Sequence, residues 1–168
     1  VFDTGPEAFA ATMEELARMG AWGIGGCCGT TPAHIAAVAE RCRTIQPQPI
    51  RPKTRTVVSS YGRAVEIDGP VLIGERINPT GKSKFKQALR EGDIGYLLRE
   101  GIAQQEAGAH ILDVNVGLPE IDETAWMTRA VRELQAILDL PLQIDTADTA
   151  TLEAAMRLYN GKPLVNSV

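Results

Sequence analysis

Two groups of residues in this sequence have the chemistry of a functional site: a pair of adjacent cysteines, and a series of acidic and amide side chains. Cys27 and Cys28 lie among glycines in the string GGCCGTTP. Neighbouring cysteines can pair only through a strained ring, and the total of three cysteines is odd. The pair is therefore expected to be either metal ligands or two small buried residues in a glycine loop, and composition alone favours neither.

The acidic and amide side chains follow four short apolar runs. The first run is VLIGERIN, residues 71–78, which lies between Pro70 and Pro79. Such runs are typical of strands that are buried on both faces of a parallel sheet, so polar residues should lie where each strand leaves the interior. In chain order these polar residues are Glu75 and Asn78, Asp113 and Asn115, Asp145, and Asn166.

The elements that would position these residues alternate along the chain. Apolar runs predict strands over 71–78, 109–115, 142–145 and 163–166. Helical spacing predicts helices between them, around Phe85 and Leu89, over 94–108, over 122–138, and from Thr149 or Thr151 to Gly161. This alternation indicates an α/β fold with a parallel sheet, whose polar strand ends meet at one edge where ligands bind.

The first part of the chain has a different pattern. We expect a helix over 6–19, a short strand over 21–25, the cysteine loop, and a second helix that begins at Thr31 and Pro32 and ends near Cys42. Prolines interleaved with polar residues then predict an extended linker, with a weak signal for a small strand or hairpin over 61–68. The expected divisions are 1–45, a linker over 46–67, and 68–168.

The number of strand–helix units is too small for a complete barrel. A (β/α)8 TIM barrel needs eight units and about 250 residues, whereas residues 68–168 hold four predicted strands. Residues 1–45 look like the last unit of a different barrel. The expectation is an α/β chain made of parts of two TIM barrels joined by a Pro-rich linker, and a fragment that is inactive by itself.

Charge and hydropathy exclude several classes of protein. The net charge is −4, and lysines and arginines form no strong cluster, which argues against a nucleic-acid or anionic-membrane partner. No apolar stretch is long enough to span a bilayer, and the first residues, VFDTGPEAFA, lack the pattern of a secretory signal. We expect a cytoplasmic protein.

Several strings occur together in a familiar order. GGCCGTTPAHI resembles the last zinc-ligand motif in the homocysteine-binding barrel of the cobalamin-dependent methionine synthases. GERINPTGKSKFK, GAHILDVNVG, IDTAD and VNSV resemble, in order, the first half of that family's pterin-binding barrel. The second half is also similar to dihydropteroate synthase and to corrinoid-linked methyltetrahydrofolate methyltransferases. The succession covers nearly the whole chain and is much more specific than any one motif.

The resemblance implies a role for the cysteine pair. Cys27 and Cys28 match two of the family's three zinc cysteines, and the third lies on an earlier strand that this chain does not contain. Three thiolates would leave zinc one open position, where the sulfur of homocysteine could bind and stay deprotonated near neutral pH.

The resemblance also implies a pterin site. Asp145 and Asn166 match the pair that holds the pyrimidine ring, and Glu75 and Asn78 match contacts from the first strand. A pterin presents an amino group and ring N–H donors beside a carbonyl, so a carboxylate and an amide are natural partners. Further pterin-site residues and the cobalamin domain would lie outside this chain.

Two more residues are retained as pterin-site candidates. Asp113 fits a structural role, in which it bonds backbone amides at the strand end, as well as it fits ligand contact. Asn115 is expected to face the site. Arg76 is expected to form an internal ion pair with Glu75.

The other residues with reactive or charged side chains have structural explanations. We expect a solvated basic face at Lys82, Lys84 and Lys86, with contact to a folate tail as a weaker alternative, core positions for Cys42, Trp22 and Trp126, a surface or capping position for His34, and a packed or paired His110.

The implied parent enzyme moves the methyl group of 5-methyltetrahydrofolate through methylcobalamin to homocysteine and forms methionine, with zinc as the second cofactor. One alternative is a pterin-dependent methyltransferase that feeds a separate corrinoid protein. Others are a dihydropteroate-synthase-like pterin-binding protein and a non-catalytic scaffold between domains.

Overall fold

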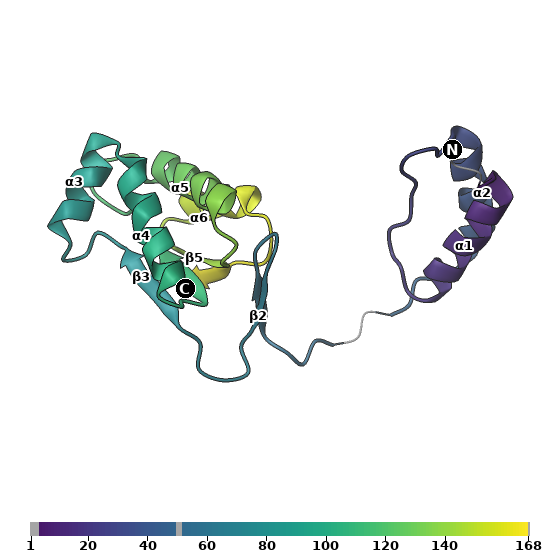
Figure 1. The fold of residues 1–168 in the computed structure, drawn as a ribbon, viewed down its shortest axis with the longest axis horizontal. Coiled ribbons are helices and arrows are strands. Elements are labelled where there is room, and N and C mark those ends of the chain that lie inside the picture. The colour runs from purple at the N-terminus through teal and green to yellow at the C-terminus, as the bar shows by residue number, and fades with distance from the viewer. Residues whose placement is uncertain (1–3, 50–51, 168) are drawn as a thin grey trace. The chain divides into compact units, whose positions relative to one another are not determined.

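The chain divides into two compact units, Val1–Pro52 and Lys53–Val168 (Figure 1). The computed structural model describes residues 4–49 and 52–167. The division falls among the prolines of the predicted linker. None of the helices in these described ranges is both long and apolar enough to cross a membrane.

The first unit is a pair of packed helices, α1 (Pro6–Arg18) and α2 (Pro32–Cys42). His34, the third residue of α2, is a buried capping residue: its Nδ1 accepts from the backbone N–H of Thr31 at 3.2 Å, and its Nε2 lies 2.9 Å from the carbonyl oxygen of Thr4. The ring also meets Phe9 edge-on, with centroids 5.6 Å apart. The expected capping role of His34 is confirmed, although the residue is buried rather than at the surface.

The segment between these helices differs from the prediction. No strand forms over residues 21–25, because no partner strand is present among residues 4–49 to satisfy its backbone groups. Trp22, expected in the core, is 65% exposed, and Cys42 is half-buried. A strand of this length is stable only when it is paired in a sheet, so local apolar character was insufficient here.

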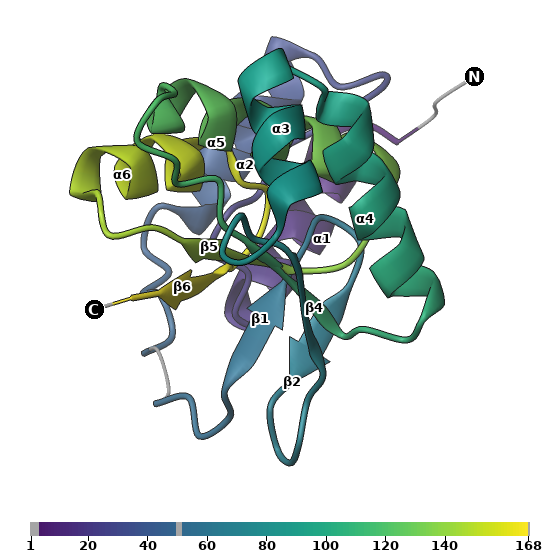
Figure 2. The ribbon, with the colours of Figure 1, turned by 90° about the vertical axis from the view of Figure 1, so that its left-hand side faces the viewer.

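The second unit holds a parallel sheet of four strands in the order β3 (Ile73–Ile77), β4 (Ile111–Val114), β5 (Leu142–Asp145) and β6 (Leu164–Asn166). The connecting helices are α3 (Ser83–Glu91), α4 (Ile94–Glu106), α5 (Glu123–Ile137) and α6 (Thr149–Leu158), and Figures 1 and 2 show them on one side of the strands. The predicted alternation is confirmed. An α/β unit with this sheet is consistent with part of a TIM-type barrel.

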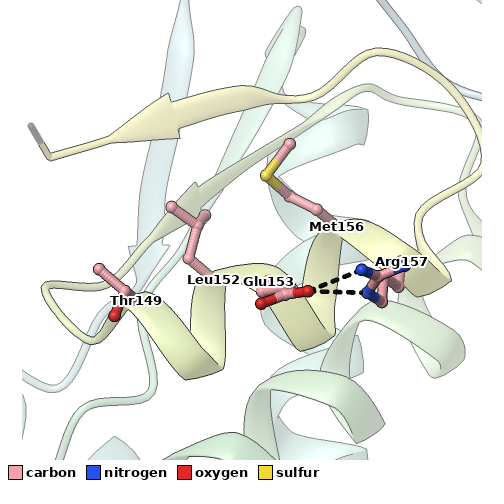
Figure 3. Close-up of a pocket in the computed structure, with 5 residues that line it drawn as sticks. All are labelled: Thr149, Leu152, Glu153, Met156 and Arg157. Atoms are coloured by element: carbon pink, nitrogen blue, oxygen red, sulfur yellow. Dashed lines mark hydrogen bonds and ion pairs between the residues drawn. The ribbon is translucent and has the colours of Figure 1, made fainter.

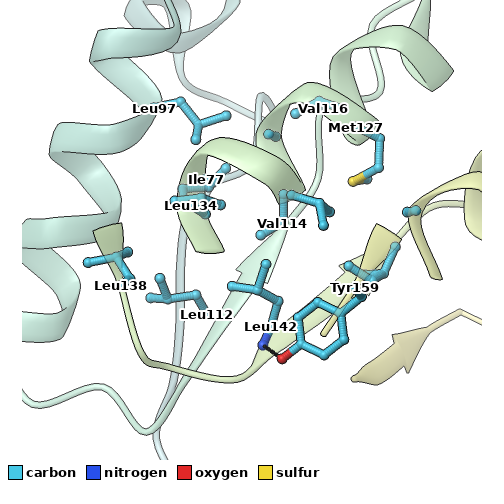
Figure 4. Close-up of a cluster of buried hydrophobic side chains, with 14 of the residues drawn as sticks. Ile77, Leu97, Leu112, Val114, Val116, Met127, Leu134, Leu138, Leu142 and Tyr159 are labelled. Carbon is cyan, nitrogen blue, oxygen red and sulfur yellow. Dashed lines mark hydrogen bonds between the residues drawn. The ribbon is translucent and has the colours of Figure 1, made fainter. Parts of the chain in front are cut away.

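The core lies between the sheet and its helices (Figure 4). Leu112 and Val114 of β4 and Leu142 of β5 are almost fully buried there, against helix residues such as Leu97 and Leu134. Trp126 packs against the same cluster as a partly buried residue, as expected. Because successive strand residues face opposite sides, this packing turns the residues between them toward the other face of the sheet.

A short hairpin lies at the amino ends of the parallel strands. Its strands are β1 (Val57–Ser59) and β2 (Ala64–Glu66), which pair antiparallel. Ser59 and Lys162, which lies just before β6, exchange two backbone hydrogen bonds of 2.8 and 3.0 Å. The hydroxyl of Tyr159 donates to the Ser59 carbonyl at 2.8 Å and accepts from the N–H of Leu142 at 3.0 Å. The hairpin begins earlier than the predicted 61–68 and is bound to the amino ends of β5 and β6.

Close approach at this junction requires glycine. Gly161 has φ of +142°, and a Cβ added there would lie 2.2 Å from the carbonyl oxygen of Ser59. A side chain at position 161 would therefore push the hairpin off the sheet.

Candidate functional site

The predicted polar residues lie at the carboxyl ends of the four parallel strands. Asp145 is the last residue of β5 and is paired in register with Asn166, the last residue of β6. Asn115 directly follows β4, and its backbone N–H donates to the carbonyl of Ile77 at the end of β3 at 2.9 Å. The sheet thus brings side chains to one edge from segments up to about ninety positions apart in the sequence.

Asn115 and Asp145 form the central contact of this edge. The Nδ2 of Asn115 donates to Oδ2 of Asp145 at 2.9 Å. The Oδ1 of Asn115 accepts from the backbone N–H of Gly117, also at 2.9 Å. Both side chains are half-buried. One oxygen of the Asp145 carboxylate therefore already accepts a hydrogen bond from the protein.

Two residues before Asn115 and Asp145, Asp113 of β4 is paired in register with Gln143 of β5. The amide Nε2 of Gln143 donates to Oδ1 of Asp113, and Asp113 is only 3% exposed. The pKa of Asp113 is raised from 3.8 to about 6, chiefly by burial and also by the nearby charges of Asp145 and Glu75, while the Gln143 hydrogen bond and the charge of Lys82 act in the opposite direction. Asp113 is thus a buried carboxyl with a side-chain partner on the neighbouring strand.

The first strand contributes two more polar side chains. Lys82 Nζ lies 3.0 Å from Oε2 of Glu75 and 2.9 Å from the backbone carbonyl oxygen of the same residue. Asn78 follows β3, and its Oδ1 accepts from the N–H of Thr80 at 2.9 Å. This bond leaves Nδ2 of Asn78 as the donor for other groups.

The expected ion pair between Glu75 and Arg76 is not found among the described residues, because adjacent strand residues point to opposite faces. Glu75 pairs with Lys82 instead, so Lys82 is part of the site edge rather than of a purely solvated face. Arg76 lines a separate polar hollow of about 250 Å³ together with Lys82, Ser83, Lys84, Tyr96 and Glu100.

Sequence reasoning missed Gln143 and the Lys82 contact. The signal for Gln143 was available, because it lies two residues before Asp145 in LQID and must share its face of the strand. The Lys82 contact depends on how the loop after β3 turns back, with Gly81 at φ of +72°, and no local pattern encodes that. His110, expected to be packed or paired, accepts from the backbone N–H of Leu72 at 2.8 Å.

The two cysteines lie in the first unit, on the loop before α2. Their side chains are exposed, and the two Sγ atoms are 3.7 Å apart. Cys28 also lines a hollow of about 170 Å³ with Thr4, Phe9 and His34. Within residues 4–49 and 52–167, no group of three His, Cys, Asp or Glu side chains is arranged to hold a metal ion.

A further hollow lies elsewhere, along α6 (Figure 3). Its volume is about 360 Å³, and it is lined by Thr149, Leu152, Glu153, Met156 and Arg157. Leu152 and Met156 project from the same side of the helix, while Glu153 pairs with Arg157 at 2.7 Å. The hollow holds none of the polar side chains of the strand ends, so we do not assign the functional site to it.

Comparison with known proteins matches each part of the chain. Residues 74–168 match the family described as pterin binding enzyme, and residues 1–42 match the family described as homocysteine S-methyltransferase. A methionine synthase of Mycobacterium tuberculosis is 35% identical over 156 residues, which make up 91% of this chain and 13% of that protein. The chain thus spans a small part of its relative's length. Because the first match covers more than half of the chain, this protein belongs to the pterin binding enzyme family.

Proposed function

We propose that the carboxyl edge of the sheet forms one side of a pocket for the pterin ring of 5-methyltetrahydrofolate. The observation that carries this proposal is the register pairing of Asp145 with Asn166 at the strand ends, inside the segment that matches the pterin binding family. Asp145 would accept hydrogen bonds from the amino group and ring N–H of the pterin, and Asn166 would pair with neighbouring ring atoms.

The remaining side chains of this edge surround Asp145 and Asn166 and complete this side of the proposed pocket. Glu75 in β3 and Asn78 just after it would approach the ring from one side, and Asp113 in β4 and Asn115 just after it lie beside Asp145. Family members' remaining pocket residues would come from strands outside this chain.

The proposed reaction belongs to a longer protein. In it, the methyl group of 5-methyltetrahydrofolate would pass through cobalamin to homocysteine, giving methionine. The name of the Mycobacterium tuberculosis relative and the homocysteine S-methyltransferase match of residues 1–42 support this sequence of transfers. Cobalamin would be bound by another domain of the same protein, and it supplies a cobalt centre that can accept and release a methyl group. The residues described here would bind and orient the pterin.

Cys27 and Cys28 are proposed as two zinc ligands. Two sulfurs bound to a tetrahedral zinc at about 2.3 Å lie about 3.8 Å apart, and the Sγ atoms of these residues are 3.7 Å apart. Their exposure leaves them accessible to a third cysteine from outside the chain. Bound zinc would keep the sulfur of homocysteine deprotonated.

The same proposal extends to the architecture. Residues 1–45 would be the last strand–helix unit of a homocysteine-binding barrel, 46–67 the connection, and 68–168 the first half of a pterin-binding barrel. The four parallel strands with helices on one side support the second assignment. A cytoplasmic location belongs to the proposal as well, because the reducing cytosol keeps cysteines as thiols that can bind zinc.

Isothermal titration of the full-length protein with 5-methyltetrahydrofolate tests the proposed pocket. We expect Asp145→Ala to weaken binding at least tenfold, since it removes a charged acceptor. Asp68→Ala is the matched control, because Asp68 is an exposed carboxylate that precedes β3, away from the carboxyl edge. Equal affinity in the wild type and Asp145→Ala would refute the pterin assignment.

A further inference from the structure

The polar side chains of β4 and β5 form a crossed ladder. Asp113 lies in β4 and Asn115 directly follows that strand, while β5 carries Gln143 and then Asp145; the members of each pair are two residues apart and so lie on one face. Each rung joins an amide on one strand to a carboxyl on the other, through the Gln143 to Asp113 and Asn115 to Asp145 hydrogen bonds. We call the Gln143–Asp113 pair the inner rung and the Asn115–Asp145 pair, which lies nearer the strand ends, the outer rung. The acid is on β4 in the inner rung and on β5 in the outer rung.

The outer rung has a defined direction. The N–H of Gly117 can only donate, so its 2.9 Å contact identifies the accepting atom of Asn115 as the carbonyl oxygen. The amide NH₂ must then point at Asp145, whose Oδ2 is 2.9 Å away. A carboxylate oxygen can accept two hydrogen bonds, so Asp145 can hold Asn115 and still receive two donors from a ligand. Asn115 therefore sets the rotation of the Asp145 carboxylate.

The inner rung places a second carboxyl, that of Asp113, diagonally across from Asp145. Asp113 faces Gln143 and Asp145 on β5, Glu75 on β3, and Lys82 in the loop before α3. Gln143 supplies the hydrogen-bond donor that the ionised form of this buried carboxyl needs. Without that donor, the ionised form would be less favourable, and Asp113 would lose its proton at a higher pH.

We infer that Asn115 and Gln143 are positioning residues of the pterin pocket: Asn115 fixes the plane of the Asp145 carboxylate, and Gln143 holds the charge of Asp113, the diagonal neighbour of Asp145 on β4. This inference rests on the proposed function. It gives Asn115 a role through Asp145 in place of direct ligand contact, and it adds Gln143 to the residues that determine pterin affinity.

Titration calorimetry of the full-length protein with 5-methyltetrahydrofolate, from pH 5 to 8, tests the inference. Asn115→Leu removes the amide at nearly constant volume, and we expect Kd to rise about 10-fold to 100-fold, as for loss of one hydrogen bond to a charged group. The double variant Asn115→Asp with Asp145→Asn exchanges the acid and the amide and so keeps a hydrogen bond between them. Its melting temperature should stay near that of the wild type, while its affinity for 5-methyltetrahydrofolate should be weaker than that of the wild type.

Gln143→Leu has a signature that a purely structural role would not produce. Removing the donor raises the pKa of Asp113, so the inflection of Kd against pH near 6 should move to higher pH. Titration of the ligand itself is the same in both proteins and cancels. Gln143→Asn is the matched conservative control; restoring a donor on β5 should return the inflection toward its wild-type position.

The outcomes separate the inference from the proposed function. If Asp145→Ala leaves binding unchanged, the pterin pocket itself is wrong. If Asp145→Ala weakens binding but Asn115→Leu binds like the wild type, Asn115 is no positioning residue. An inflection that stays in place in Gln143→Leu refutes the role of Gln143.

Discussion

Lys82 reaches back from the loop after β3 to contact Glu75 twice, once at its carboxylate and once at its backbone carbonyl oxygen, at 3.0 and 2.9 Å. The contact ties the start of α3 to the strand that precedes it. It also limits the directions in which the Glu75 carboxylate can point. The strength of this restraint is set by solvent, because the Lys82 side chain is 25% exposed and that of Glu75 58% exposed.

Lys82→Met should therefore have a small effect. Ion pairs at this exposure contribute about 1 kcal/mol or less, so we expect pterin affinity in the full-length protein to fall less than about fivefold. Titration calorimetry at two salt concentrations measures the effect, which should shrink at high salt because ions screen the pair. Lys84→Met, an exposed lysine two residues on, is the matched control. A loss of more than tenfold would mean that Lys82 contacts the ligand itself.

Asp113→Asn should change how stability depends on pH. The pKa of Asp113 is about 6 in the folded protein and 3.8 as the ordinary value, so the folded state binds the extra proton between these pH values. Wild-type stability consequently falls as pH rises from about 4 to 6, by roughly 2–3 kcal/mol. Asp113→Asn removes this loss, so its melting temperature should rise relative to wild type over that interval.

Melting temperatures of the full-length proteins from pH 4 to 7.5 measure this difference. Asp68→Asn is the control, because Asp68 is an exposed carboxyl outside the ladder. A difference between Asp113→Asn and wild type that is constant with pH would show that Asp113 does not gain a proton on folding.

Tyr159→Phe should weaken the junction between the hairpin and the sheet. The variant leaves the N–H of Leu142 without the hydroxyl that accepts it, at a position where Leu142 is 1% exposed. An orphaned buried donor costs about 1–3 kcal/mol. Faster hydrogen exchange at the Leu142 amide, measured by mass spectrometry, is the expected result. Tyr61→Phe, at a tyrosine that is 63% exposed, should leave exchange unchanged.

Cys27→Ser and Cys28→Ser should each remove zinc from the full-length protein. Serine cannot supply the thiolate that binds zinc near neutral pH. Metal analysis after gel filtration measures the zinc content, and Cys42→Ser is the control because Cys42 lies on α2, away from the glycine loop. Stoichiometric zinc in Cys27→Ser or Cys28→Ser would exclude that residue as a ligand.

The elements of the second unit could be predicted because their signals are local. The run LQID is a strand over its whole length, and Gly92 ends α3 in the left-handed conformation, with φ of 77°. The strand expected over 21–25 failed for the opposite reason, since its stability depends on partner strands that are not among the described residues. Trp22 remains exposed for the same reason.

In the candidate site, too, some features could be predicted from the sequence and others could not. Strand ends could be located from Asp145 and Asn166, because topology alone gathers the carboxyl ends of parallel strands. The partners of these residues could not, because they depend on register and on loop paths. Gln143 faces Asp113 only when β4 and β5 align as they do, and Lys82 meets Glu75 only after the turn at Gly81.

The attachment of the hairpin also determines when the second unit can be completed during synthesis. Ser59 and Lys162 are separated by 103 positions, so a ribosome that adds about 5–20 residues per second needs roughly 5–20 s to make the partner of Ser59. Until then the hairpin has an unpaired edge, which can recruit other strands. Pairing with Lys162 removes this edge, so completing β6 also protects the hairpin from pairing with other chains.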